Sequence, residues 1–302
     1  MTNTEKLKGI IPPMITPLLD RNTLDVEGLE KLVEHILGGG VHGLFLLGTT
    51  GEAPSLSYKL RYELIEKATA FIGSRVPVLV GISDTSFTES VNVAKKAADC
   101  GADAVVLAPP YYFTAGQPEL VEYVEHLCQE LPLPMYLYNM PGCTKINLEP
   151  DTVAELSKLD KIVGLKDSSG NLTYFNTVKT LLADRDDFSL LVGPEELLAQ
   201  SVLLGADGGV NGGANIFPSL YVELYKASVA GDLAKVRELH AKVMQISTTI
   251  YRVGKYGSSF MKSVKCVLKL KGICSDYMEE PFHKFRPAEV EKIKRFLEQE
   301  MI

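Results

Sequence analysis

The alternation of short apolar runs with longer amphipathic stretches is the feature of this sequence that most constrains its fold. Stretches such as DVEGLEKLVEHIL place apolar residues at i, i+3, i+4 and i+7, the spacing of one helix face. Several of the short runs are apolar nearly throughout, as expected of parallel strands covered on both faces. The expected strands are 9–17, 43–48, 77–83, 104–110, 134–141, 162–169, 189–193 and 208–214.

Strands that alternate with helices in this way fit a (β/α)8 barrel, an α/β fold of roughly 250 residues. The main alternative is a doubly wound open sheet, which favours a GxGxxG fingerprint in its first strand-to-helix turn. Here the first turn reads TPLLDRNTLD and contains no glycine, so the barrel is favoured. After residue 216 only helical stretches follow. We therefore expect a barrel over residues 1–230 and a helical extension over residues 231–302.

Composition and charge exclude several classes of protein. The 302 residues carry a formal net charge of −7 with acids and bases intermixed, which argues against a nucleic-acid platform. The amino terminus lacks the apolar core of a signal peptide, and no apolar run has the length of a membrane span. Five scattered cysteines form no CxxC pair, and the five histidines show no metal-binding spacing. We expect a cytoplasmic protein with no metal and no membrane or nucleic-acid partner.

Lys166 directly follows the apolar run at residues 162–165. A lysine is almost never fully buried unless it is paired or used chemically. If its side chain points into the barrel, burial lowers the pKa of the amine and leaves a nucleophile that can form a Schiff base with a carbonyl group. The alternative is a surface lysine in the loop after the strand, and position alone does not separate the two.

Two other strand ends carry polar groups, and barrel active sites are built at these ends. Tyr136 and Tyr138 share one strand face, so Tyr138 could shuttle a proton beside Lys166; ordinary barrel packing is the alternative. The stretch GTTGE at 48–52 offers backbone amides and the hydroxyls of Thr49 and Thr50 to a carboxylate, or is only a tight turn before a helix.

Three further stretches have simpler explanations. PPYYF at 109–113 adds aromatic residues that ordinary packing explains, and GPEE at 193–196 is either a helix start or a source of acceptors for substrate hydroxyls. GGVNGG at 208–213 has the composition of a phosphate loop but no neighbouring lysine, so we interpret it as close backbone packing.

Five motifs in order, GTTGE, PPYY, YNMPG, GLKDSSG and LGADGGV, make the chain resemble the dihydrodipicolinate synthase / N-acetylneuraminate lyase family of class I aldolases from about residue 9 onward. The resemblance implies a (β/α)8 barrel with C-terminal helices, usually a homotetramer built from dimers, which forms a Schiff base with pyruvate or another 2-keto acid. It implies no metal and no organic cofactor, only the covalent imine on the catalytic lysine.

The resemblance also assigns roles to individual residues. Lys166 matches the Schiff-base lysine, Tyr138 the catalytic tyrosine, and Thr49 with Thr50 the pair that holds the keto-acid carboxylate, with Thr49 also relaying protons. Val210 sits where the family's main chain touches pyruvate. Tyr112 matches the tyrosine that in synthases reaches into a neighbouring subunit's site.

The substrate is less constrained. Synthases carry an arginine where this chain has Cys143, and a thiol cannot bind a carboxylate by a bidentate fork, which counts against lysine biosynthesis unless Lys145 compensates. Ser168, Glu195 and Glu196 stand where lyases of sugar acids contact the sugar chain. Neuraminate lyases usually show GSTGE instead of GTTGE. We therefore expect an aldolase for a 2-keto-3-deoxy sugar acid, with dihydrodipicolinate synthase, N-acetylneuraminate lyase or a non-catalytic keto-acid sensor as alternatives.

Overall fold

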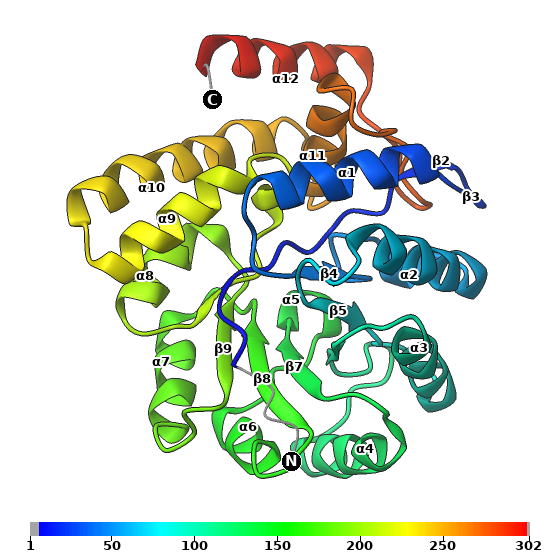
Figure 1. Ribbon diagram of the computed structural model, residues 1–302, viewed down its shortest axis with the longest axis vertical. Coiled ribbons are helices and arrows are strands. Elements are labelled where there is room, and N and C mark those ends of the chain that lie inside the picture. The colour runs from blue at the N-terminus through cyan, green and yellow to red at the C-terminus, as the bar shows by residue number, and fades with distance from the viewer. Residues whose placement is uncertain (1–5, 301–302) are drawn as a thin grey trace.

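A parallel eight-stranded sheet surrounded by helices forms the centre of the molecule (Figure 1). The computed structural model describes residues 6–300. The strand order is β1-β10-β9-β8-β7-β6-β5-β4, and every pairing in it is parallel. The strands are β1 (Gly9–Ile10), β4 (Leu44–Leu46), β5 (Val78–Gly81), β6 (Ala104–Leu107), β7 (Met135–Asn139), β8 (Ile162–Asp167), β9 (Ser189–Val192) and β10 (Gly208–Gly209). Together with the helices this is the expected (β/α)8 barrel.

Helices follow most strands, and the last ones lie beyond the barrel. The α-helices are α1 (Val26–Gly38), α2 (Tyr58–Ile72), α3 (Phe87–Asp99), α4 (Gln117–Glu130), α5 (Pro141–Thr144), α6 (Pro150–Leu156), α7 (Leu172–Leu181), α8 (Leu198–Leu203), α9 (Pro218–Ala230), α10 (Leu233–Thr248), α11 (Ser259–Leu270) and α12 (Pro287–Glu300). Short 3-10 helices are η1 (Ala53–Ser55), η2 (Glu195–Leu197), η3 (Gly212–Asn215) and η4 (Ile250–Arg252).

Side-chain caps fix where several of these helices begin. The Asp25 carboxylate accepts the Gly28 N–H at the start of α1, and the Ser57 hydroxyl accepts the Leu60 N–H at the start of α2. Asn171 caps α7 in the same way. These caps satisfy backbone donors that have no partner inside the helix. Each cap therefore sets the end of the loop that connects a strand end to the following helix.

Hydrogen bonds between the first strand segment and β4 close the barrel. The Met14 N–H donates to the Phe45 carbonyl at 2.8 Å, and the Phe45 N–H donates to the Pro12 carbonyl at 3.0 Å. An isolated parallel bridge joins Pro13 to Phe45. Every edge of the sheet is thus paired.

All eight strands of the sheet are shorter than the sequence predicts, and two of them lose most of their expected length. The expected strand 9–17 is reduced to β1 and the single bridge at Pro13, because Pro12 and Pro13 have no N–H to donate to a ladder. The expected strand 208–214 is reduced to β10, because the chain turns into η3 at Gly212. The segment between β1 and α1 also forms a small antiparallel hairpin that the sequence analysis did not predict, with strands β2 (Leu18–Asp20) and β3 (Thr23–Leu24).

The barrel interior is filled by one cluster of buried side chains. Its members come from the strands and from the residues that directly follow them: Ile11, Phe45, Leu79, Ala104, Val106, Ala108, Tyr136, Tyr138, Leu191 and Val210. Gly164 makes room for the Tyr136 ring, since a Cβ at this position would lie 2.4 Å from it. Tyr136 and Tyr138 share the inward face, as their spacing predicts.

The last three helices form the extension at one end of the barrel, shown at the top of Figure 1. Helix α10 packs against α9 and η4, and α11 packs against η4, η3 and α12. The boundary expected between residues 230 and 231 falls in the turn between α9 and α10. Within residues 6–300 no helix is both long and apolar enough to cross a membrane.

Candidate active site

The amine of Lys166 is buried inside the barrel. Lys166 lies in β8, and 5% of its surface is exposed. Its Nζ lies 4.1 Å from the ring centroid of Tyr138 and 4.9 Å from that of Phe45. No ion pair to this amine is found in the described part of the chain. Burial lowers the pKa of the Lys166 amine, and the nearby Tyr138 only partly opposes this effect. The surface interpretation of Lys166 is therefore excluded.

Tyr138 lies between Lys166 and Thr49, which follows β4. In the register of β7 and β8, Tyr138 is paired directly with Lys166. The Tyr138 hydroxyl lies 3.3 Å from the Thr49 hydroxyl, and either group can donate. This arrangement provides a path for a proton that begins beside the amine and leads to Thr49.

The GTTGE stretch forms a tight, strained turn after β4. Gly51 N–H donates to the Gly48 carbonyl and Glu52 N–H to the Thr49 carbonyl, both at 3.1 Å. Leu47 and Glu52 have φ values of 56° and 58°, which non-glycine residues rarely adopt. Such strain persists only where the surroundings hold the backbone in place, and it concentrates at functional sites.

Val210 lies across the barrel, directly after β10. Its N–H donates to the Val192 carbonyl at 2.8 Å, so its carbonyl is the main-chain group left for a ligand. The glycines around it allow close approach of backbone: a Cβ on Gly208 would lie 1.9 Å from the Gly9 carbonyl oxygen. This agrees with the interpretation of GGVNGG as close packing.

Both carboxylates after β9 are bonded to protein groups. Glu195 is buried and accepts the Gly213 N–H at 2.8 Å and the Tyr221 hydroxyl. Burial raises the pKa of Glu195 to about 7, although the hydrogen bonds lower it in part. The neighbouring Glu196 accepts the Ser247 hydroxyl. Both lie in the wall of the site, where they brace η3, α9 and α10.

A cavity of about 630 Å³ brings most of the expected residues together. The expected residues that line it are Thr49, Thr50, Tyr138, Cys143, Lys166, Ser168, Glu195, Glu196 and Val210. Tyr112 is the exception. It is 79% exposed and contacts Phe113 edge to face, away from this cavity.

Part of the cavity wall comes from the helical extension and is not predicted from the sequence. These residues are Tyr251, Tyr256, Gly257, Ser258, Phe260, Met261 and Phe282. They follow no barrel strand, so the rule that sites form at strand ends does not select them. Their aromatic and apolar character is the only signal the sequence contains, and it is equally typical of core packing.

The charges in the cavity differ from those needed to bind a second carboxylate. Among the described residues, Lys166 is the only cationic side chain in the lining. Cys143 lies in α5, and Lys145 is the residue that directly follows this helix. The Lys145 Nζ donates to the Gly142 carbonyl at 2.8 Å, and Lys145 does not line the cavity. Lys145 thus does not take the place of the arginine that Cys143 replaces.

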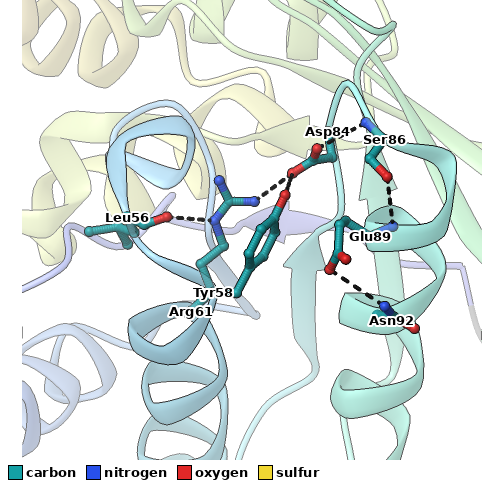
Figure 2. A network of polar contacts seen from close by, with 7 residues as sticks. All are labelled: Leu56, Tyr58, Arg61, Asp84, Ser86, Glu89 and Asn92. Carbon is teal, nitrogen blue, oxygen red and sulfur yellow. Dashed lines mark hydrogen bonds and ion pairs between the residues drawn. The ribbon is translucent and has the colours of Figure 1, made fainter.

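A smaller cavity of about 160 Å³ lies behind Thr49 and Tyr138 and is also lined by Tyr111. Nearby, the buried Arg61 and Asp84 form an ion pair at 2.9 Å. Figure 2 shows this pair, with the Tyr58 hydroxyl donating to the same Asp84 oxygen at 3.1 Å. Burial alone would raise the pKa of Asp84, but its hydrogen bonds together hold that pKa below the ordinary value.

The site at the carboxyl end of the barrel is of the aldolase type. It combines a buried amine, a tyrosine–threonine hydroxyl pair and a turn rich in backbone amides. The model of the dihydrodipicolinate synthetase family matches residues 6–300, and the chain belongs to this family. The protein is therefore an enzyme, a carbon–carbon lyase of the aldolase class.

Relatives differ in the reaction named for them. A structure of dihydrodipicolinate synthase from Bacteroides thetaiotaomicron is 59% identical, with a TM-score of 0.95 over 97% of this chain and 98% of that one. A probable 2-dehydro-3-deoxy-D-pentonate aldolase, YjhH, of Escherichia coli K12 is 36% identical over 87% of this chain and 88% of its own. YagE of E. coli K12, solved in complex with pyruvate, is 30% identical, with a TM-score of 0.91 over 97% and 98%.

Proposed function

We propose that this enzyme cleaves a hydroxylated 2-keto acid, such as a 2-keto-3-deoxy sugar acid, into pyruvate and an aldehyde through an imine on Lys166. The observation that carries the proposal is the buried Lys166 amine beside Tyr138 in a cavity with no other cationic side chain among the described residues. The complex of YagE with pyruvate supports pyruvate as the ligand. No metal or organic cofactor takes part in this chemistry.

The reaction begins at Lys166 and proceeds through Tyr138. The neutral amine adds to the C2 carbonyl, and Tyr138 gives its proton to the departing C2 hydroxyl, which leaves as water from a protonated imine. The Tyr138 phenolate then takes the C4 hydroxyl proton. The C3–C4 bond breaks, its electron pair moves into the imine to form an enamine, and the aldehyde leaves.

The second half returns the enzyme to its starting state. Tyr138 protonates C3 of the enamine and restores the imine. Water adds at C2 and gives a proton back to Tyr138, and the bond to nitrogen breaks to release pyruvate and the free amine. Thr49 orients the Tyr138 hydroxyl, and Thr50 holds the keto-acid carboxylate. The Val210 main chain also touches the bound keto acid, through a carbonyl that accepts from a hydrogen-bearing part of the substrate because its N–H is already bonded to Val192. No oxidant or reductant is consumed.

The charge of the cavity favours a neutral polyol chain over a second carboxylate. Aspartate semialdehyde, the second substrate of a synthase, carries a carboxylate, and no arginine or further lysine lines the described cavity. Ser168 and Glu196 supply hydroxyl and carboxylate oxygens of the kind that bind sugar hydroxyls. A 2-keto-3-deoxy sugar acid fits both features.

The synthase reaction is the second candidate, because the Bacteroides thetaiotaomicron structure bears that name at 59% identity. Two assays separate the candidates: pyruvate release from a panel of 2-keto-3-deoxy sugar acids and N-acetylneuraminate, and pyruvate consumption in the presence of aspartate semialdehyde. We expect cleavage of a deoxy sugar acid with the highest kcat/KM. A higher value for semialdehyde condensation would contradict the proposal, and binding without turnover would indicate a sensor.

Tyr112 remains a candidate for a shared site in a homotetramer built from dimers. It lies outside the cavity, and its ring and that of Phe113 are both largely exposed. An exposed aromatic pair is suited to burial in a subunit interface. We propose that Tyr112 contacts the small cavity behind Thr49 in a neighbouring subunit.

A further inference from the structure

A buried ion pair joins the helical extension to the turn that carries Thr49 and Thr50. Lys265 of α11 is 1% exposed, and its Nζ contacts the Glu52 carboxylate, which is 4% exposed. The same Nζ donates to the Tyr277 carbonyl at 2.6 Å. Neither charged group takes part in the proposed chemistry, and neither lines the cavity. A pair that costs desolvation at both ends calls for an explanation.

Glu52 is the residue that ends the strained turn. Its φ of 58° is held while its N–H donates to the Thr49 carbonyl. The turn has a second anchor, because the Thr16 hydroxyl donates to the Gly51 carbonyl at 2.7 Å. Two segments therefore hold the turn, the chain that follows β1 and the helical extension.

The helical extension contacts the turn at a second point. The Glu279 N–H donates to the other oxygen of the Glu52 carboxylate at 2.9 Å. Glu279 also accepts the Phe282 N–H at its carbonyl, 3.0 Å away, and Phe282 lines the active-site cavity. The Glu52 carboxylate thus connects the turn with the loop that carries Phe282 into the cavity lining.

We propose that Lys265 is a positioning residue that acts through Glu52 to hold the turn in the shape that presents Thr49 and Thr50 to the keto-acid carboxylate. This inference rests on the proposed imine mechanism and deepens it, because it makes the helical extension part of the substrate-binding apparatus. Without the ammonium, the buried Glu52 carboxylate loses its counter-charge, and the left-handed backbone of Glu52 is no longer held.

The test compares two ketones, each of which can form an imine with Lys166. Pyruvate has a carboxylate for the turn to bind, whereas acetone has none. Each is incubated with the enzyme and borohydride, and the reduced adduct on Lys166 is measured by peptide mass spectrometry. For Lys265→Met we expect the pyruvate concentration for half-maximal labelling to rise about 10- to 100-fold, the effect of losing charge-assisted hydrogen bonds. Labelling by acetone should stay within about twofold, because it does not use the turn.

Ser263→Ala is the matched control on the same helix. Ser263 is fully buried and donates to the Ile250 carbonyl at 2.7 Å, away from the turn. It should leave the ratio of pyruvate to acetone labelling unchanged even if it lowers Tm. Should Lys265→Met not fold, Glu52→Gln with Lys265→Met removes both charges together, and we expect the same loss of selectivity for pyruvate.

The outcomes separate this inference from the proposed function. A wild-type enzyme that pyruvate does not label at Lys166 would overturn both. A labelled wild-type enzyme whose charge variants lose pyruvate and acetone labelling equally, or lose neither, would overturn the positioning role alone. A selective loss of pyruvate labelling in Lys265→Met, or in the double variant if the single variant does not fold, would support it.

Discussion

Tyr138 and Lys166 lie directly opposite each other in the paired strands β7 and β8, with the lysine Nζ 4.1 Å from the centre of the tyrosine ring. This contact places a hydroxyl-bearing ring beside a desolvated amine. Because both residues are fixed by the ladder of a barrel, little reorganisation is needed when a substrate arrives.

We predict that Tyr138→Phe separates imine formation from carbon–carbon cleavage. The ring that packs on Lys166 is kept, while the hydroxyl 3.3 Å from Thr49 is lost. Loss of a general acid–base group lowers kcat by roughly 10²- to 10⁴-fold. Borohydride labelling by pyruvate should still reach completion on a longer time scale. Equal turnover in variant and wild type would show that Tyr138 only packs.

The pH dependence of imine formation should report the environment of Lys166. Because burial lowers its pKa below the ordinary 10.5, the neutral amine becomes available at lower pH than for a surface lysine. The rate of pyruvate labelling should rise with pH and level off well before pH 10.5. Labelling reactions quenched after fixed times at a series of pH values measure this rate. A rise that continues through the ordinary lysine range would contradict the role assigned to burial.

Glu195 should make the protein less stable as the pH rises from its unfolded to its folded pKa. Its pKa rises from 4.5 in the unfolded chain to about 7 in the fold, so between these values the folded state binds more protons. Stability is then highest below pH 4.5 with respect to this group and declines up to about pH 7. A shift of this size corresponds to roughly 3 kcal/mol.

Glu195→Gln tests this expectation. It keeps an oxygen for the Gly213 N–H and cannot ionise. Urea unfolding at several pH values gives the free energy of unfolding as a function of pH. Between pH 4.5 and about 7 this free energy should fall less steeply in the variant than in the wild type. Parallel slopes would mean that Glu195 is ionised in the fold across this range.

Cys143→Arg should change which aldehyde the enzyme accepts. Cys143 lines the cavity, where a guanidinium could bind a carboxylate by two parallel hydrogen bonds. Such bonds contribute about 1.5–3 kcal/mol, or roughly ten- to a hundredfold in selectivity. We expect kcat/KM to rise for aspartate semialdehyde condensation and to fall for the neutral sugar acid. A parallel fall on both, in a folded variant, would mean that Cys143 only packs.

Much of the barrel and of the candidate site could be predicted because both depend on local patterns. The two-residue period of a strand places Tyr136 and Tyr138 on one face, and barrel sites form at strand ends, which selects Lys166 and Thr49. Strand lengths were less predictable where Pro12 and Pro13 interrupt the ladder.

The contribution of the extension could not be predicted, because it depends on contacts between segments far apart in the sequence. Nothing local to Lys265 indicates that it pairs with Glu52. Likewise, Phe260 and Phe282 read as ordinary core residues until the fold places them in the cavity wall.

Borohydride labelling of the wild-type enzyme with pyruvate tests the central claim most directly. After digestion, the peptide that contains Lys166 should carry the mass of one reduced pyruvyl group, and Lys166→Met should abolish the adduct. Lys161→Met, which removes a lysine near the start of the same strand, serves as the control and should leave labelling intact. Stoichiometric labelling at Lys166 is the predicted result. Label elsewhere, or none at saturating pyruvate, would contradict the account.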